Sequence, residues 1–381
     1  MNPAADALGL YIHLPWCEKK CPYCDFNSHE RQNLPEDRYI SALLRDLDHD
    51  VTLAGSRQIT SIFIGGGTPS LFSAGAIDRL LQGVNERLSL AGNIEITLES
   101  NPGSAEAGKF AGFRAAGVNR LSLGIQSFHD ASLRALGRVH SAAQALRAVE
   151  AARTAGFDNL NLDLMHGLPE QSVNEGLADL QQALQLAPEH LSWYQLTIEP
   201  NTRFYSAPPL LPVEDSLARL EEEGGAMLAA GGFMRYEVSA YARGNARCRH
   251  NLTYWQFGDY LALGAGAHGK ITRPDGSVWR YAKARQPDAY LDARTGQHTS
   301  QQRHLSAQDL AGEFMLNALR LDAGVPVQRF SEATGLPFAA IEATVASLVG
   351  EGLLEENPDR LRTTALGGRF LDSVVARFFP D

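Results

Sequence analysis

The sequence predicts an α/β protein whose main domain is a partial barrel of parallel strands, followed by an extension and a small helical domain. Short apolar strands alternate with amphipathic helical stretches through the first 200 residues, a pattern typical of parallel strands joined by helical crossovers. There are six such units, which favours an open (β/α)6 barrel over eight-fold closure. After the sixth unit the alternation stops.

The elements can be taken in chain order. We expect the parallel strands at 8–14, 59–64, 93–99, 119–125, 159–165 and 190–198, with helices between them such as 36–53 and 141–155. The barrel pattern ends after Leu211. A helix at 213–230, a strand at 234–240 and a glycine-rich segment at 258–269 follow.

The last part of the chain, from about residue 306, reads as helical with two short strands at 353–356 and 360–364. This arrangement is winged-helix-like. We therefore expect three domains: the barrel at 1–235, the extension at 236–300 and the winged-helix-like domain at 301–381. Winged helices often bind DNA, but the net charge of −10 favours a structural or docking role and no nucleic-acid partner.

Composition places the chain in the cytoplasm. With 381 residues and 44% hydrophobic content it can bury a large core. Its longest apolar stretches, such as 226–230, are far shorter than the roughly 20 residues that span a bilayer. The first 16 residues lack the basic region and the apolar run of a signal peptide.

Polar or glycine residues follow every predicted strand at its carboxyl end. In a parallel barrel these ends lie on one face, where active sites are built, so we expect the residues to share one pocket. The alternative is that polar residues simply end strands. The positions are 17–24, 65–69, Glu99, Gln126, Asp163, and Thr197 with Glu199.

Three of the four cysteines, Cys17, Cys21 and Cys24, fall within eight residues in the pattern C-x3-C-x2-C. Clustered thiols in a reducing compartment indicate metal ligands. Structural zinc takes four protein ligands, whereas three thiolates on a four-iron cluster leave one iron open. The alternative is a zinc knuckle completed by His13 or His29.

With Tyr23 before the last cysteine and Gly65-Gly66-Gly67-Thr68-Pro69 after the second strand, the chain resembles the radical SAM superfamily over all six strands. The resemblance implies a 4Fe-4S cluster on the three cysteines, an electron donor for it, and S-adenosylmethionine (SAM) bound at the open iron. Three consecutive glycines allow backbone to approach a ligand, whereas a tight turn would need only one.

Within that superfamily the chain is similar to the oxygen-independent coproporphyrinogen oxidase family, which implies its SAM contacts. For the first SAM the matching positions are Tyr11, Gly66 and Glu99. For a second SAM they are Tyr23, Gly67, Thr68, Gln126, Arg138, Asp163 and Thr197. The alternatives are a helix N-terminal cap for Glu99 and a structural ion pair between Arg138 and Asp163.

Two features resemble the haem chaperone branch of the family. The oxidase pattern has a further cysteine where this chain has Phe26, and the chaperone motif H-N-x-x-Y-W stands at 250–255. The resemblance implies haem bound through His250, Tyr254 and Trp255, an acceptor protein that is often respiratory, and thus peripheral contact with a membrane. The residues alone favour packing of this segment onto the barrel.

Three functional classes follow from the sequence. The first is a chaperone that binds haem and transfers it to an acceptor. The second is an oxidase that decarboxylates coproporphyrinogen III, and the third is a structural zinc protein. The fourth cysteine, Cys248, is either a second haem ligand or anchor or a small buried hydrophobic residue.

Overall fold

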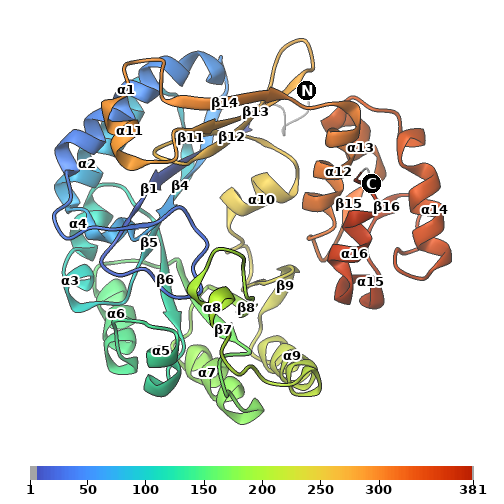
Figure 1. The fold of residues 1–381 in the computed structure, drawn as a ribbon, viewed down its shortest axis with the longest axis horizontal. Helices are drawn as coiled ribbons and strands as arrows, with labels where there is room; N and C mark the ends of the chain where they lie inside the picture. Colours follow the sequence, from blue (N-terminus) through green and yellow to red (C-terminus); the bar gives the residue numbers. More distant parts are fainter. Residues whose placement is uncertain (1–6, 380–381) are drawn as a thin grey trace.

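The computed structural model describes residues 7–379, and its centre is one curved sheet of twelve strands (Figure 1). Residues 1–6 and 380–381 lie outside the described residues. The first 16 residues, in which the sequence showed no signal peptide, are therefore described only from residue 7. The six predicted parallel strands are all present, and they lie side by side in chain order. They are β1 (Ala7–Leu14), β4 (Gln58–Gly66), β5 (Leu90–Ser100), β6 (Arg120–Gln126), β7 (Leu160–His166) and β8 (His190–Gln195).

The sheet is open, as the count of six units predicts, and both of its faces are covered at the centre. Along β1, Leu8, Leu10 and Ile12 are fully buried in the main hydrophobic core. Helices cover the convex side of the sheet (Figure 1). The longer ones are α1 (Glu36–Ala54), α2 (Ala74–Arg87), α6 (Ala142–Thr154), α7 (Val173–Gln185) and α9 (Glu214–Ala230), and the shorter ones are α3 (Ser104–Ala107), α4 (Phe110–Ala115), α5 (Asp130–Ala135) and α8 (Arg203–Ser206).

Serine caps explain where several of these helices begin. Ser73 caps α2, and Ser141 and Ser172 form complete capping boxes with Gln144 and Glu175 at the starts of α6 and α7. Each cap satisfies backbone N–H groups that the first helical turn leaves without partners. The caps thus fix the crossover lengths that place the strand ends on one face.

The extension lengthens the sheet on the far side of β1. Strand β11 (Asp259–Leu263) pairs in parallel with β1, and three antiparallel strands follow it. They are β12 (His268–Thr272), β13 (Val278–Lys283) and β14 (Thr299–His304), with α11 (Pro287–Asp292) between the last two. The sequence predicted no strand in the glycine-rich segment because glycine weakens the β signal, yet Gly264 and Gly266 form the turn between β11 and β12 at positive φ.

At the other edge, the single strand predicted at 234–240 is wrong. The chain forms a hairpin of β9 (Met234–Glu237) and β10 (Ala240–Ala242), and β10 pairs with β8. Helix α10 (Arg249–Trp255) then returns to the concave side of the sheet (Figure 1). There it contacts β1, β4 and β11.

The C-terminal helices form a second hydrophobic core that includes Phe314, Phe330 and Leu348, together with Phe257 and Val278 from the extension. The helices are α12 (Ala307–Ala318), α13 (Val327–Thr334), α14 (Glu342–Gly350), α15 (Ala365–Arg369) and α16 (Leu371–Ala376), with a small sheet of β15 (Val325–Pro326) and β16 (Arg360–Leu361). The strand predicted at 353–356 is reduced to one bridge between Leu354 and Thr363.

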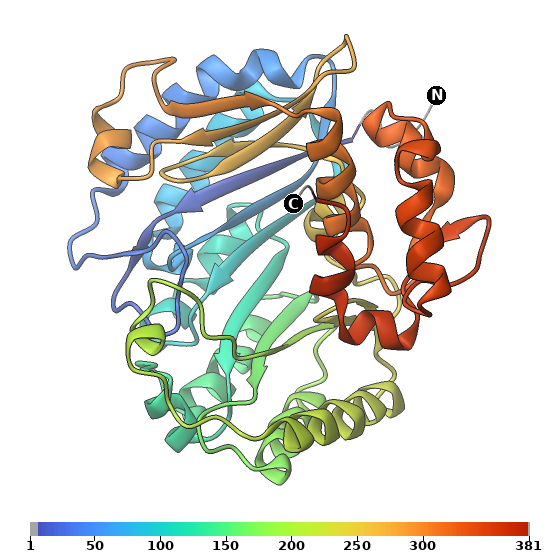
Figure 2. The ribbon, with the colours of Figure 1, turned by 45° about the vertical axis from the view of Figure 1, so that its right-hand side comes forward.

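In Figure 2 the parallel strands point away from the C-terminal helices and toward the dark-blue loop after β1. The carboxyl ends of the strands and the C-terminal domain therefore lie at opposite ends of the sheet. None of the helices within residues 7–379 combines the length and the apolar character needed to cross a lipid bilayer.

Candidate functional site

The cysteine loop connects two short strands at the carboxyl end of β1. These strands, β2 (Trp16–Cys17) and β3 (His29–Glu30), pair in parallel and close the loop at its base. The side-chain amide of Asn27 donates to the carbonyl oxygens of Ala265 and Arg285, both at 2.9 Å. The loop is thus tied to the barrel on one side and to the extension on the other.

Each of the three thiols has a polar neighbour. The Thr68 hydroxyl donates to Cys17 Sγ at 3.6 Å, Arg138 Nη1 donates to Cys21 Sγ at 3.5 Å, and Ser28 Oγ lies 3.5 Å from Cys24 Sγ. Arg138 Nε is buried without a hydrogen-bond partner. Hydrogen-bond donors beside the sulfurs, and one buried guanidinium N–H without a partner, fit an anionic iron–sulfur centre and a bound ligand at this position.

His13 does not complete a zinc site in this structure. Its Nδ1 lies 2.9 Å from the Tyr11 hydroxyl and its Nε2 lies 2.9 Å from the Asn27 carbonyl oxygen, so both ring nitrogens are engaged. Burial lowers the pKa of His13 to about 4. His29, the other candidate, places Nε2 3.3 Å from Asn27 Oδ1. No group of three His, Cys, Asp or Glu side chains within the described residues surrounds a single-ion position.

The glycine run after β4 packs tightly beneath the cysteine loop. Gly66 has φ +115°, and a Cβ atom there would lie 2.7 Å from the His13 ring. A Cβ atom on Gly67 would lie 2.5 Å from the Trp16 carbonyl oxygen. Glycine is required at both positions because the loop approaches the backbone so closely. The Gly66 N–H donates to Glu99 Oε2 at 3.2 Å.

Glu99 projects from β5 into the interior of the barrel. Burial, followed by the nearby Asp163, raises its pKa to about 8, although the Gly66 N–H and Arg120 act in the opposite direction. Glu99 lies within the strand and not at a helix N-terminus, so the alternative role as a helix cap is wrong. The pKa of Tyr11 is also raised, mainly by burial and to a lesser extent by the nearby Glu99.

Arg138 and Asp163 do not form the structural ion pair that the sequence left open. Arg138 Nη2 donates to Asn101 Oδ1 at 2.6 Å and to the Gly124 carbonyl oxygen at 2.9 Å. The Asp163 carboxylate instead accepts from the Ser122 hydroxyl at 2.9 Å and from the Asn161 amide at 2.7 Å.

The other predicted contacts of a second SAM also lie at the carboxyl end of the sheet. Gln126 ends β6 at φ +68° and accepts from the Tyr194 hydroxyl at 2.9 Å. Tyr23 is half-buried, burial raises its pKa, and it packs near Phe204 with ring centroids 6.3 Å apart. Thr197 is exposed two residues beyond β8.

Sequence reasoning missed Arg120, which is 2% exposed at the start of β6 and has a buried Nε without a partner. An arginine in an otherwise apolar predicted strand was the available signal. It lies close enough to Glu95, Asp163 and Cys248 for each of them to raise its pKa, against the effect of burial. A buried positive charge therefore balances the carboxylates inside the barrel.

His250 in α10 is buried inside the barrel, 1% exposed. Its Nδ1 lies 3.0 Å from Ser61 Oγ and its Nε2 lies 2.7 Å from the Tyr254 hydroxyl. The ring stacks on Phe63 with centroids 5.3 Å apart, and burial lowers the pKa of His250 to about 3. In this structure the imidazole has no free nitrogen for haem iron. Its contacts are those expected if this segment packs onto the barrel.

The rest of this motif also packs within the protein. Trp255 lies beneath the Arg320 guanidinium, 4.3 Å from the ring centroid, and borders the C-terminal core. Cys248 is fully buried, its Sγ donates to Glu95 Oε1 at 3.7 Å, and burial raises its pKa to about 12. Only Tyr254 faces a cavity that reaches the cysteine loop.

That cavity, which we call the mouth cavity, has a volume of about 610 Å³ and lies between the cysteine loop, the concave face of the sheet and the extension. Its lining includes Tyr11, Gly66 and Glu99, the three positions predicted for the first SAM. It also includes Phe26, which is 64% exposed, and, from the extension, Tyr254, Tyr260, His268, Ala282, Arg285 and Gln301.

Comparison with known proteins gives matches to most of the chain. Residues 11–183 match the Radical SAM superfamily and residues 305–370 match the HemN C-terminal domain. The chain is 48% identical over 375 residues to a protein of Escherichia coli named "Heme chaperone HemW", covering 98% of each chain. It is 37% identical over 392 residues to "Radical S-adenosyl methionine domain-containing protein 1, mitochondrial" of Mus musculus, covering 99% of this chain and 88% of the other.

Among solved structures, coproporphyrinogen III oxidase (HemN) from Escherichia coli, a radical SAM enzyme, superposes with a TM-score of 0.82 at 23% sequence identity. The match covers 98% of this chain and 90% of the other. At this identity the likeness shows a shared fold. It also shows that the barrel, extension and C-terminal helices occur together in both proteins.

Proposed function

This chain belongs to the HemW family of radical SAM proteins, and on that basis we propose that it is a haem chaperone, which binds haem and transfers it to an acceptor protein. The 48% identity to a heme chaperone HemW over nearly the whole of both chains carries the proposal. Phe26 supports it, because the oxidase pattern requires a further cysteine at that place.

We propose that Cys17, Cys21 and Cys24 hold a 4Fe-4S cluster that binds SAM. When bound, such a cluster supplies an electron, delivered by an external donor, and an open iron for the amino and carboxylate groups of SAM. The hydrogen-bond donors next to the three sulfurs support this assignment. The exposed side of the loop leaves access for the electron donor.

The residues around the loop divide into two proposed sets. Tyr11, Gly66 and Glu99 line the mouth cavity together and are proposed to contact the first SAM. Tyr23, Gly67, Thr68, Gln126, Arg138, Asp163 and Thr197 are proposed for a second SAM. The unpartnered Nε of Arg138 supports a ligand in the second set, since a buried donor without a partner is costly.

The proposed domains would divide the work among the barrel at 1–235, the extension at 236–300 and the C-terminal domain at 301–381. We propose that the barrel holds cluster and SAM, the extension completes the haem site, and the C-terminal domain packs the base of the barrel. We further propose a cytoplasmic protein that attaches peripherally to a membrane where its acceptor is a respiratory membrane protein.

The test is anaerobic reconstitution of the full chain with iron and sulfide, followed by haem titration in the Soret band and a parallel assay with coproporphyrinogen III. We expect haem to bind with a stoichiometry near one and coproporphyrinogen to remain unconverted. The Phe26→Cys variant is the matched control, because restoring that cysteine alone should not create oxidase activity. Conversion by the unmodified chain without stable haem binding would place it among the oxidases.

A further inference from the structure

We propose that the iron of the transported haem is ligated by His268, in the lining of the mouth cavity. This proposal rests on the proposed function, since it concerns how the chaperone holds its haem. It moves the ligand from the H-N-x-x-Y-W motif to strand β12 of the extension. The argument has three steps: the availability of the imidazole, the space beside it and the charges around it.

His268 is the available imidazole of the mouth cavity. It is exposed, it lines the cavity, and no hydrogen bond or ion pair joins its side chain to any other described residue. The other histidine of the cavity lining, His13, is buried with both ring nitrogens engaged, as is His250 beneath it. Iron ligation needs a neutral imidazole with one free nitrogen, and burial lowers the pKa of His268, which favours that form.

The side chain across the sheet from His268 is small. In the sheet, His268 on β12 pairs with Ala282 on β13, and Ala282 pairs with Gln301 on β14. All three line the cavity, so the small Ala282 side chain leaves room next to the imidazole. Tyr254, Tyr260 and Phe26 provide flat apolar surface around this space, which suits a porphyrin ring.

One positive charge at the cavity edge suits a propionate of haem. Arg285 is exposed at the cavity edge, and its Nε donates to Asn27 Oδ1 at 3.3 Å, which orients the guanidinium without neutralising it. Arg280 lies deeper and is held by Glu313 and by Tyr260, so its charge is already partnered. A haem with iron on His268 would therefore direct a propionate toward Arg285.

The same cavity also holds the residues proposed for the first SAM. Tyr11, Gly66 and Glu99 line it together with His268, so the two ligands would share one chamber. Asn27 links the cysteine loop to this chamber, because its side chain binds the extension while its backbone carbonyl contacts His13. The cysteine loop is thus connected directly to the proposed haem site.

The experiment compares haem binding to the reconstituted full chain and to four variants, one of them His250→Ala, using Soret titration and electron paramagnetic resonance of ferric haem. We expect His268→Ala to lose the signature of histidine ligation and to bind haem at least about tenfold more weakly. Added imidazole should restore the signature in that variant. His304→Ala, an exposed histidine on β14 outside the cavity, is the matched control and should bind like the unmodified chain.

The third variant, Ala282→Phe, fills the space beside the imidazole and should also weaken haem binding while the chain keeps its cluster. The outcomes separate the two proposals. Histidine ligation that persists in His268→Ala, or that is lost in His250→Ala alone, would overturn the assignment and leave the chaperone function standing. Absence of haem binding by the unmodified chain would overturn both.

Discussion

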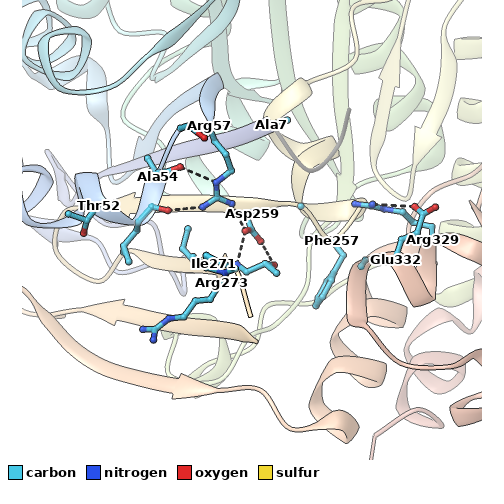
Figure 3. A pocket seen from close by; sticks show the side chains of 17 residues that line it. Ala7, Thr52, Ala54, Arg57, Phe257, Asp259, Ile271, Arg273, Arg329 and Glu332 are labelled. Carbon is cyan, nitrogen blue, oxygen red and sulfur yellow. Dashed lines mark hydrogen bonds and ion pairs between the residues drawn. The ribbon is translucent and has the colours of Figure 1, made fainter. Parts of the chain in front are cut away.

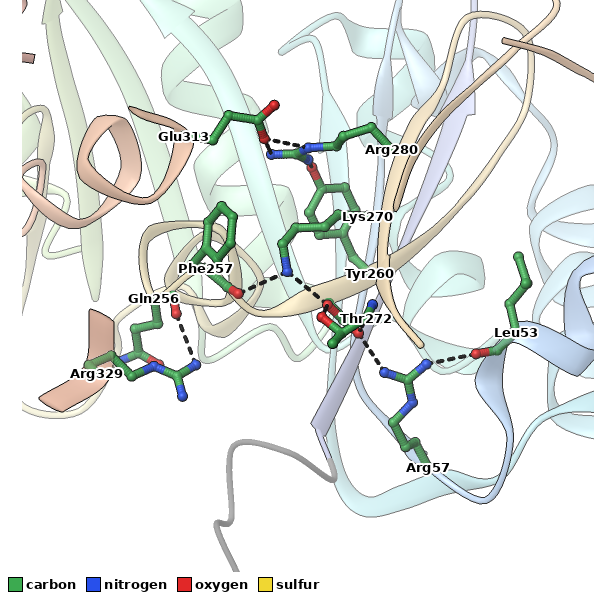
Figure 4. Close-up of polar contacts among 11 residues, drawn as sticks. Leu53, Arg57, Gln256, Phe257, Tyr260, Lys270, Thr272, Arg280, Glu313 and Arg329 are labelled. Atoms are coloured by element: carbon green, nitrogen blue, oxygen red, sulfur yellow. Dashed lines mark hydrogen bonds and ion pairs between the residues drawn. The ribbon is translucent and has the colours of Figure 1, made fainter. Parts of the chain in front are cut away.

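Polar side chains at the two ends of the parallel sheet differ in how they are paired. At the amino end, the side chains of Lys270 and Arg57 extend toward the same place (Figure 4). Asp259 accepts there from Lys270 at 2.8 Å and from Arg57 at 2.7 Å. Burial alone would raise the pKa of Asp259, but Lys270, Thr272 and Arg57 hold it below its usual value. At the carboxyl end, Arg138 Nε is buried without a partner, and His268 is free in the mouth cavity.

A second cavity shows why volume alone does not identify a site. This cavity, at the amino end between the barrel and α13, measures about 450 Å³ (Figure 3). Arg57 on its wall binds Asp259, and Arg329 lies 3.8 Å from Glu332 and donates to the Gln256 carbonyl oxygen. Arg57 and Arg329 are thus paired on the wall of this cavity, whereas Arg138 Nε and His268 have no hydrogen-bond partner among the described residues. Arg120 Nε, at the start of β6, is an exception at the amino end.

The largest effect is expected from replacing a cysteine of the cysteine loop, and the buried Cys248 provides the comparison. Cys17→Ser should abolish stable cluster incorporation, because the remaining two thiols cannot hold a four-iron cluster. Cys248→Ser is the matched control: its hydroxyl can still donate to Glu95, so it should retain the full iron and sulfide content of the unmodified chain. Iron and sulfide analysis after anaerobic reconstitution measures both. Equal loss of cluster in both variants would contradict the division between the two ends.

Asp259→Ala tests the paired end. The change leaves Lys270, 1% exposed, without its carboxylate partner, so the free energy of unfolding should fall by about 3–5 kcal/mol, measured by denaturant titration. Asp37→Ala breaks an exposed ion pair with Arg79 and should cost about 0–1 kcal/mol. Replacing Lys270 by methionine as well should recover part of the loss. A small effect of Asp259→Ala alone would mean that this network does not stabilise the fold.

Periodicity predicted the parallel strands well because their two faces are covered by the same chain. Each of β1, β4 and β6 is mainly apolar and mainly buried, and the structure places them where that pattern indicates. The extension was harder to predict. Glycines at 264, 266 and 269 obscured β11 and β12, and the parallel pairing of β11 with β1 joins residues about 250 positions apart. No local pattern reports such a contact.

The candidate site also contains residues that the sequence could identify and residues that it could not. The spacing of the three cysteines predicts a cluster site, and the place of Glu99 at a strand end predicts a binding role. His250 drew attention through its motif, but its burial depends on Ser61 and Phe63, which come from a distant strand. His268 belongs to no recognised sequence motif, and its proposed role follows from the cavity around it. Exposure and hydrogen bonding are properties of the folded chain, so sequence reasoning could not separate these two histidines.

The last prediction concerns the pH dependence caused by Glu99, a carboxylate of the carboxyl end. Its pKa is raised to about 8 from an ordinary value of 4.5, so the folded chain binds a proton there that the unfolded chain has released. In the absence of SAM, the free energy of unfolding should therefore decrease as pH rises from about 5 to 8, by at most about 1.4 kcal/mol per pH unit. Glu99→Gln should flatten this slope in urea titrations at several pH values. A slope that is the same in the variant would show that Glu99 ionises in the folded chain as readily as in water, and that the cavity, like the amino end, already compensates its charge.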